Sequence, residues 1–224
     1  MPAEYYFMTS LPALGALGEP PPISLGEFLA RAGDIETIRR ACETVLLEHD
    51  LLMRQAALAG EIERVEPAVL SAAQARGEAS LEGTLEVEEA EVLRGAGEDR
   101  LWAAYYRRVA EVAEALDCDF LRQWAGYEVA LRNALVELRA RTLELNADDY
   151  RVAPELADDA EVEPAVAAWA AADEPLEAMK ALDAARWQWL QGHNAWYSFS
   201  VDEAAAYARG LVLMTRWHAI ARTS

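Results

Sequence analysis

The chain has 224 residues, of which 53% are apolar and 26% charged, a composition typical of a folded globular protein rather than a disordered chain. Its 39 acidic and 20 basic residues give a net charge of −19, and no run of basic residues exceeds two. Nucleic acid and anionic membrane surfaces bind clustered positive charge, so we expect neither as a partner. The two cysteines form no Cys-x-x-Cys pair, which excludes a disulfide framework and a cysteine-based zinc site.

No stretch approaches the roughly 18 consecutive apolar residues that a membrane-spanning helix needs. The first residues lack the basic start and apolar run of a signal peptide. We therefore expect a cytoplasmic protein that is not embedded in a membrane, with both thiols reduced.

The negative charge is unevenly distributed. Residues 61–100 carry 11 acidic and 4 basic residues, and residues 147–180 carry 10 and 2, whereas 101–146 and 181–224 are nearly neutral. One interpretation is that the acidic segments are solvated faces and loops that keep the protein soluble. The other is that they form an acidic surface for a basic partner.

Helix signals begin early in the chain. Residues 4–14 are apolar and aromatic, and their pattern fits either an extended segment or a first helical turn. Ser24 and Glu27 have the spacing of a capping box, which predicts a short helix ending at Gly33. Asp34 is suited to cap the next helix.

Apolar positions at helical spacing predict that this next helix spans 34–60, and a further short helix is expected over 62–76 despite Pro67. Within 77–100, the alternation around Leu85 and Val87 hints at a strand, although an acidic helix or loop fits equally well.

The clearest element runs from Glu98 to about Asn146, as one helix over 98–116 and a longer one from Phe120 onward, with a break or passage at 117–119. The long helix carries two apolar seams at a 3–4 spacing, which predicts helix-on-helix packing. These seams are formed by Trp124, Leu131, Leu138 and Leu145, and by Tyr127, Ala134 and Leu135. The pairs Glu128–Arg132 and Glu137–Arg141 are expected on the outer face.

The expected fold is an all-α, multi-helix bundle with one long central helix and a C-terminal helical hairpin. We divide the chain softly into an N-terminal helical region (1–146), an acidic linker or helical excursion (147–180) and C-terminal helices (181–224), and a single domain is also compatible. A capping box at Ser200 and Glu203 predicts the start of the last helix. This helix is apolar nearly all round, so it must be buried on most sides or meet a partner.

Catalytic motifs are not recognisable in the sequence. The three histidines lack metal-ligand spacing, no phosphate-binding or dinucleotide-binding glycine pattern occurs, and Gly-x-Ser-x-Gly is missing. Cys42 lies on an apolar helix face, where a core position is expected. We therefore predict no catalytic, cofactor-binding or metal-binding residue and a protein that is not an enzyme, while a site assembled from distant residues remains an alternative.

An aromatic cluster near the C-terminus is the one unusual constellation. It can be either a local core where the last two helices cross or a binding hot spot, since Trp, Tyr and Arg dominate interface energetics. The residues that we predict to bind a partner are Trp187, Trp189, Trp196, Tyr197, Phe199, Arg216 and Trp217.

Three segments resemble a family of bacterial proteins of unknown function whose genes lie in operons of V-type (archaeal-like) rotary ATPases. The opening segment consists of Glu4-Tyr5-Tyr6-Phe7-Met8-Thr9-Ser10-Leu11-Pro12 followed by Pro21-Pro22-Ile23-Ser24. The middle segment comprises Phe120-Leu121-Arg122-Gln123-Trp124, Glu128 and Leu131-Arg132-Asn133-Ala134-Leu135. The closing segment comprises Arg186-Trp187-Gln188-Trp189-Leu190, Phe199-Ser200, Ala206-Tyr207 and Arg216-Trp217.

The resemblance implies a role with the ATPase. Such operons otherwise lack a recognisable gene for the socket subunit, the helical part that joins the rotating central shaft of the motor to the membrane ring. The implied function is a non-enzymatic connector or accessory subunit, similar to that socket, which contacts the shaft or the ring at the cytoplasmic face of the inner membrane. The alternative is a helical adaptor or assembly factor that is not part of the finished motor.

Overall fold

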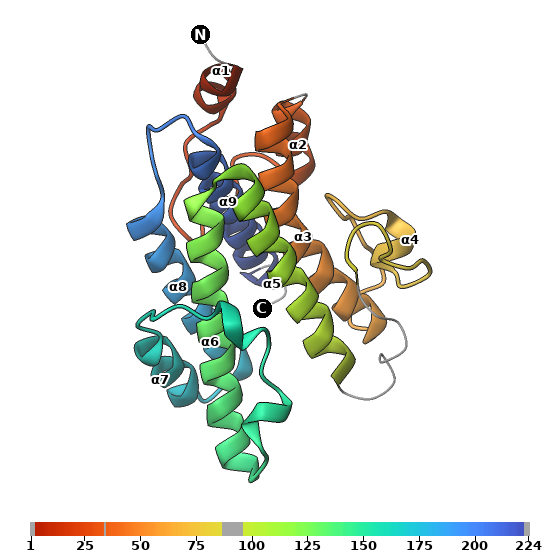
Figure 1. Cartoon of the computed structure of the whole chain (residues 1–224), viewed down its shortest axis with the longest axis vertical. Helices are drawn as coiled ribbons and strands as arrows, with labels where there is room; N and C mark the ends of the chain where they lie inside the picture. Colours follow the sequence, from red (N-terminus) through yellow and green to blue (C-terminus); the bar gives the residue numbers. More distant parts are fainter. Residues whose placement is uncertain (1–2, 34, 87–95, 222–224) are drawn as a thin grey trace.

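The computed structural model describes residues 3–33, 35–86 and 96–221, and all regular structure in these ranges is helical. This confirms the all-α fold class. The bundle is built mainly from α3 (Glu36–Leu58), α5 (Ala96–Leu116), α6 (Asp119–Leu143), α8 (Pro175–His193) and α9 (Val201–Ala221) (Figure 1).

Helix α9 lies inside the bundle, against α3, α6 and α8. Every residue from Glu203 to Met214 is buried, as expected for a helix that is apolar nearly all round. The contact between α8 and α9 confirms the predicted C-terminal hairpin. The two-helix unit of α5 and α6 packs beside this pair, so the long helix has partners on several sides (Figure 1).

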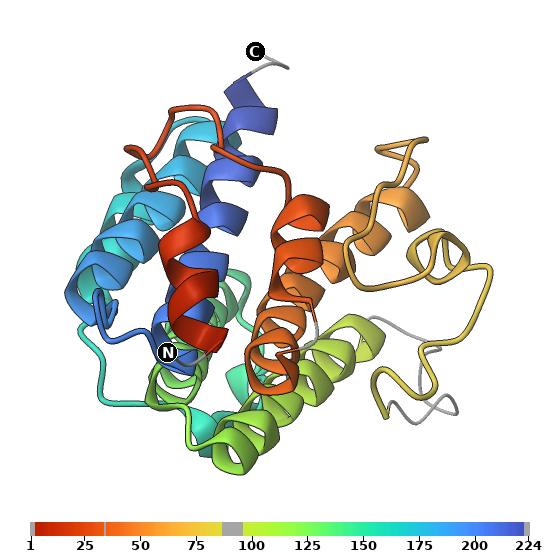
Figure 2. The ribbon, with the colours of Figure 1, turned by 90° about the horizontal axis from the view of Figure 1, so that it is seen from above.

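Two short helices precede the bundle. The 4–14 segment contains α1 (Ala3–Ser10), so the helical alternative holds. Helix α2 (Leu25–Ala32) begins as predicted, because Ser24 Oγ accepts a hydrogen bond from the Glu27 amide at 3.2 Å, and it ends at Gly33 with φ 54°. The cap expected at Asp34 lies outside the described residues. In Figure 2 the chain between α1 and α2 runs beside α9.

The helix predicted over 62–76 is wrong in extent, since only α4 (Ala72–Ala75) is helical. The cause is Asp50 on α3, whose buried carboxylate accepts hydrogen bonds from three successive backbone amides, at 2.9 Å from Ala68, 2.6 Å from Val69 and 2.8 Å from Leu70. Amides held in this way cannot donate within a helix. The hint of a strand is also wrong for Leu85, a buried loop residue, while Val87 lies outside the described residues.

Helix α6 ends earlier than its sequence pattern predicts. The chain breaks at Asp117, where φ is 49°, and α6 then stops at Leu143 because Glu144 takes a left-handed conformation. The apolar seam is buried at Trp124 and Leu131 but is exposed at Leu145, beyond the helix end.

The acidic segment 147–180 contains two 3-10 turns, η2 (Ala147–Asp149) and η3 (Pro154–Leu156), and the helix α7 (Glu163–Ala171). Both turns lie against α6, and α7 lies against α6 and α8. The helical excursion therefore describes this segment better than a linker does. The proposed domain boundary stays a prediction.

Candidate functional site: an aromatic groove beside a buried ion network

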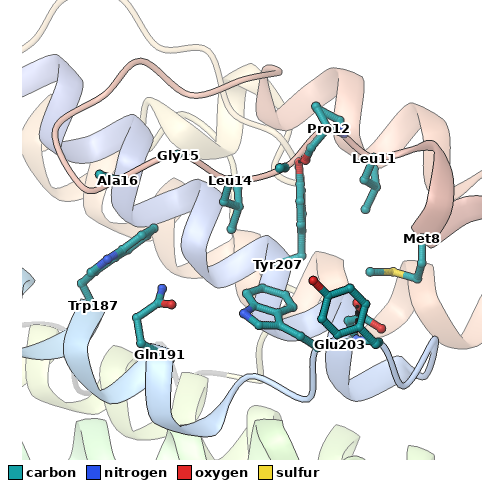
Figure 3. Close-up of a pocket in the computed structure, with 13 residues that line it drawn as sticks. Met8, Leu11, Pro12, Leu14, Gly15, Ala16, Trp187, Gln191, Glu203 and Tyr207 are labelled. Carbon is teal, nitrogen blue, oxygen red and sulfur yellow. Dashed lines mark hydrogen bonds between the residues drawn. The ribbon is translucent and has the colours of Figure 1, made fainter.

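A groove of about 620 Å³ opens between the chain that follows α1 and the helices α8 and α9. We call it the aromatic groove. Its lining residues are Met8, Leu11, Pro12, Ala13, Leu14, Gly15, Ala16, Trp187, Gln191, Trp196, Tyr197, Glu203 and Tyr207. Figure 3 shows Pro12, Leu14, Gly15 and Ala16 on one wall, with Trp187 and Gln191 of α8 facing them across the space.

Contacts with α9 and with the loop before it hold the wall formed by the early chain in place. The Tyr207 hydroxyl donates a hydrogen bond to the Pro12 carbonyl at 2.8 Å. The rings of Tyr5 and Phe199 lie 4.8 Å apart. Burial raises the pKa of Tyr207 to about 12, so its hydroxyl keeps the proton that it donates. The groove therefore depends on contacts between residues nearly 200 positions apart.

The opposite edge is formed by the loop between α8 and α9, residues 194–200. Tyr197 and Phe199 both have left-handed backbone, with φ 69° and 53°. The Glu203 carboxylate holds them there by accepting hydrogen bonds from the Tyr197 amide at 3.0 Å and the Phe199 amide at 2.6 Å. Left-handed backbone costs a residue with a side chain roughly 1–2 kcal/mol, and two such residues in one loop are typical of a functional segment.

The predicted capping box at Ser200 is therefore only partly right. Glu203 does reach back to backbone amides, but those of Tyr197 and Phe199, and the Ser200 hydroxyl bonds that of Ser198 at 2.8 Å.

The structure separates the seven residues predicted to bind a partner. Trp187, Trp196 and Tyr197 line the groove, and Tyr197 is 84% exposed. Phe199 supports the loop through Tyr5.

Three of the seven lie elsewhere. Trp189 points away from the groove, where its ring stacks on Tyr127 at 5.1 Å and on His193 at 4.1 Å. Trp217 is partly buried and lies next to the chain at Gly18. Arg216 belongs to the ion network described next. The core interpretation therefore describes Trp189, which packs on Tyr127, and the binding interpretation stays a prediction for the residues that line the groove.

Behind the groove, six charged side chains from four helices form a buried ion network: Glu48 of α3, Glu128 of α6, Asp183 and Arg186 of α8, and Arg209 and Arg216 of α9. Arg186 binds Glu128 through two hydrogen bonds of 2.7 and 3.0 Å, and it binds Asp183 at 3.0 Å. Arg209 pairs with Glu48 and lies 3.5 Å from Glu128. Arg216 lies 3.4 Å from Asp183. Three positive and three negative charges balance.

The outer-face position predicted for Glu128 is wrong. Its side chain is 2% exposed and pairs with Arg186, while Arg132 instead lies over the Trp102 ring at 4.5 Å. The i,i+4 spacing to Arg132 suggested a surface pair, whereas the actual partner lies 58 positions away. No local pattern reveals such a pair. The other expected pair, Glu137–Arg141, is present at 3.4 Å.

Electrostatics differ between the two glutamates. Burial opposes ionisation of Glu128, but Arg186 and Arg209 outweigh it and hold its pKa below the usual range. Burial also opposes ionisation of Glu48, and there it prevails over Arg209, aided by the nearby Glu128, so the pKa of Glu48 is raised. Burial alone would lower the pKa of Arg186, but the carboxylates of Glu128 and Asp183 outweigh burial and raise that pKa well above its usual range. Glu128 is therefore the anion on which the network depends most.

Within the described residues, no group of three or more His, Cys, Asp or Glu side chains is arranged to hold a metal ion. A search of the same residues finds no helix with the length and apolarity needed to cross a membrane. Comparison with protein-family models, curated proteins and solved structures gives no significant match.

Gly210 allows the early chain to lie close to α9, and this predicts how the groove can be disturbed selectively. A Cβ at Gly210 would lie 2.5 Å from Leu14 Cδ1 and 3.3 Å from Leu190 Cδ2. We expect Gly210→Ala to displace Leu14 and to speed amide hydrogen exchange in residues 11–16 by about tenfold, the effect of losing roughly 1.4 kcal/mol of Leu burial. Mass-spectrometric hydrogen exchange measures this.

The matched control is Gly192→Ala, because a Cβ there meets nothing within 4 Å. That variant should exchange like the wild type over residues 11–16. Equal exchange in both variants would show that Leu14 does not hold the wall in place.

Proposed function

We propose that the protein is a non-enzymatic connector or accessory subunit of a V-type rotary ATPase, with a role like that of the socket between shaft and membrane ring, and that it binds another part of the motor through the aromatic groove. The observation that carries this proposal is that the three segments resembling the ATPase-operon family meet in space. The opening and closing segments touch through Pro12 and Tyr207, and the middle and closing segments through Glu128 and Arg186. Residues that carry the resemblance thus form one connected constellation, of which the opening and closing segments contribute lining residues to the groove.

The ion network supports a connecting role in particular. It joins α3, α6, α8 and α9 through paired charges, and buried polar or charged groups fix helix register in some proteins, a role that we propose for this network. A part that transmits torque needs helices that do not slide past one another. Close-packed interiors with low compressibility transmit such strain.

Co-expression with the other ATPase subunits, followed by native mass spectrometry, tests the proposal. We expect the chain to appear at a fixed copy number in the assembled motor, on its cytoplasmic side. A motor that assembles completely without the chain would contradict the connector role. Presence only in incomplete assemblies would instead favour the alternative, an assembly factor.

Tyr197→Ala should weaken this association. The side chain is 84% exposed and makes no contribution to the core, so the variant should unfold like the wild type while its occupancy in the motor falls at least about tenfold, as for an interface hot spot of about 1.4 kcal/mol or more. Tyr150→Ala is the matched control, since Tyr150 is also an exposed tyrosine, at 41%, but follows η2 away from the groove. Equal loss in both variants, or in neither, would place the interface elsewhere.

A further inference from the structure

The aromatic rings of the groove lack a contact that three of the five other tryptophans of the chain make. Three tryptophans outside the groove have an arginine over the ring: Arg132 lies 4.5 Å from Trp102, Arg209 lies 4.0 Å from Trp124, and Arg139 lies 5.0 Å from Trp169. Within the described part of the chain, no cation lies over Trp187, Trp196 or Tyr197. No arginine of the described chain therefore occupies these rings, and the Tyr197 ring, which is 84% exposed, can take a cation from outside.

The charges around the groove also favour a positively charged occupant. Its lining contains one acidic residue, Glu203, and no lysine or arginine. A neighbouring hollow of about 720 Å³ shares Trp196 and Tyr197 with the groove and adds Asp119 and Asp202, again without lysine or arginine. Asp119 pairs with Arg122, whereas Asp202 accepts a hydrogen bond from the Phe120 amide at 2.8 Å and lies beside the shared aromatic wall.

The groove also has an apolar wall. Leu14 lies across the space from Trp187, and Leu11 and Met8 continue the wall beyond Tyr207 on the side of Glu203 (Figure 3). A suitable occupant combines apolar side chains, to cover this wall, with a positive charge for the aromatic rings and carboxylates. Such a combination is typical of an amphipathic segment of a protein.

We infer that the groove takes a polypeptide segment of a partner protein in which an arginine or lysine flanks apolar side chains, with the cation against Trp196 and Tyr197. The inference rests on the proposed function, because it names the chemistry of the motor segment that binds this site. A second copy of the chain is a poor occupant, since it brings a net charge of −19 against the same acidic surface. The same repulsion disfavours anionic lipid.

A peptide experiment on the isolated protein tests the inference without any other part of the ATPase. The probe is a helical peptide of leucine, alanine and arginine with arginines beside the leucine face, and its matched counterpart has citrulline at each arginine. Citrulline preserves the shape and removes the charge. Isothermal titration calorimetry at physiological ionic strength, where long-range attraction is screened, measures both affinities.

We expect the arginine peptide to bind about tenfold more tightly than the citrulline peptide, the size of a partly desolvated cation–π contact. Tyr197→Ala, and separately Trp196→Leu, should reduce this ratio toward one, whereas Tyr150→Ala should leave it unchanged. Equal binding of the two peptides to the wild type would overturn the inference in favour of a purely apolar occupant. An unchanged ratio in the Tyr197→Ala protein would overturn it in favour of general attraction to the acidic surface.

Sedimentation of the free protein at the same concentrations tests whether a second copy of the chain occupies the groove. A dimer that Tyr197→Ala dissociates would show that a second copy fills the groove and would overturn the inference. The two proposals fail separately. Peptide selectivity without assembly into the motor contradicts only the ATPase role, and assembly into the motor without peptide selectivity contradicts only the cationic segment.

Discussion

Replacing Glu128 by glutamine should destabilise the protein by about 3–5 kcal/mol, the cost of breaking a buried ion pair from one side. Glutamine has nearly the same size, so packing around α6 stays the same. The change removes one of three negative charges and leaves Arg186 and Arg209 with an uncompensated positive charge in a buried site. Urea denaturation followed by circular dichroism measures the loss as a lower transition midpoint with an unchanged slope.

Glu48→Gln is the matched comparison and should cost less at neutral pH. The raised pKa of Glu48 shows that burial already disfavours its charge, so a neutral side chain of the same shape is better tolerated there. The two variants should also respond to pH in opposite directions. A loss for Glu48→Gln at neutral pH as large as that for Glu128→Gln would contradict this ranking of the two glutamates.

The direction of each pH effect depends on whether the folded or the unfolded protein binds the glutamate's proton more tightly. Glu128 has a lowered pKa in the folded protein, so its stabilising contribution is present above the ordinary glutamate pKa and is lost as the pH falls below it. The gap between wild type and Glu128→Gln should therefore stay constant down to about pH 4.3, the ordinary glutamate pKa, and narrow as the pH falls below it. Glu48 has a raised pKa, so its protonation favours the folded state, and the wild type should gain stability relative to Glu48→Gln as the pH falls through that raised pKa to about 4.3, above the range in which Glu128 responds.

Asp50→Ala should have the second large effect, a loss of about 3 kcal/mol. The substitution leaves the amides of Ala68, Val69 and Leu70 without their acceptor, and each buried amide left unpaired costs about 1–3 kcal/mol, reduced here because the loop can relax toward water. Residues 61–71 should also become the first site of limited proteolysis. Urea denaturation and mass spectrometry of the fragments measure the two effects.

Asp50→Asn provides the graded control. It retains one carbonyl oxygen, which can still accept two of the three amides, so its loss of stability should be clearly smaller. Equal losses for Asp50→Ala and Asp50→Asn would mean that charge, rather than the set of hydrogen bonds, determines the effect.

The parts of the fold that local spacing determines are predictable from the sequence. The 3.6-residue apolar period and the Ser24 cap mark α2 and α3, and the continuous apolar surface of the last helix explains why α9 is buried. Local spacing fails to predict the structure of residues 62–76, because Asp50 on α3 accepts hydrogen bonds from amides of this segment that a helix would need. Local spacing misplaces Glu128 for the same reason, since the partners that draw it into the core lie on α8 and α9.

Only one wall of the aromatic groove could be predicted from the sequence. An excess of tryptophan and tyrosine near the C-terminus points to the cluster, but composition does not tell Trp187, which lines the groove, from Trp189, which packs on α6. The opposite wall comes from Met8, Leu11 and Leu14, which carry no signal of binding in the sequence. Apolar residues of this kind are identified as groove residues only by what they face.

The hydrogen bond between Tyr207 and Pro12 spans 195 positions and has a consequence for the synthesis of the protein. The ribosome releases the residues of the early wall well before those of α9, so the groove cannot form until α9 has been made. Until then, Met8, Leu11 and Leu14 have no groove to line and stay exposed to solvent or bound by a chaperone. A nascent or truncated chain that lacks α9 therefore cannot form the groove, and any binding that requires the groove begins only after α9 has been translated.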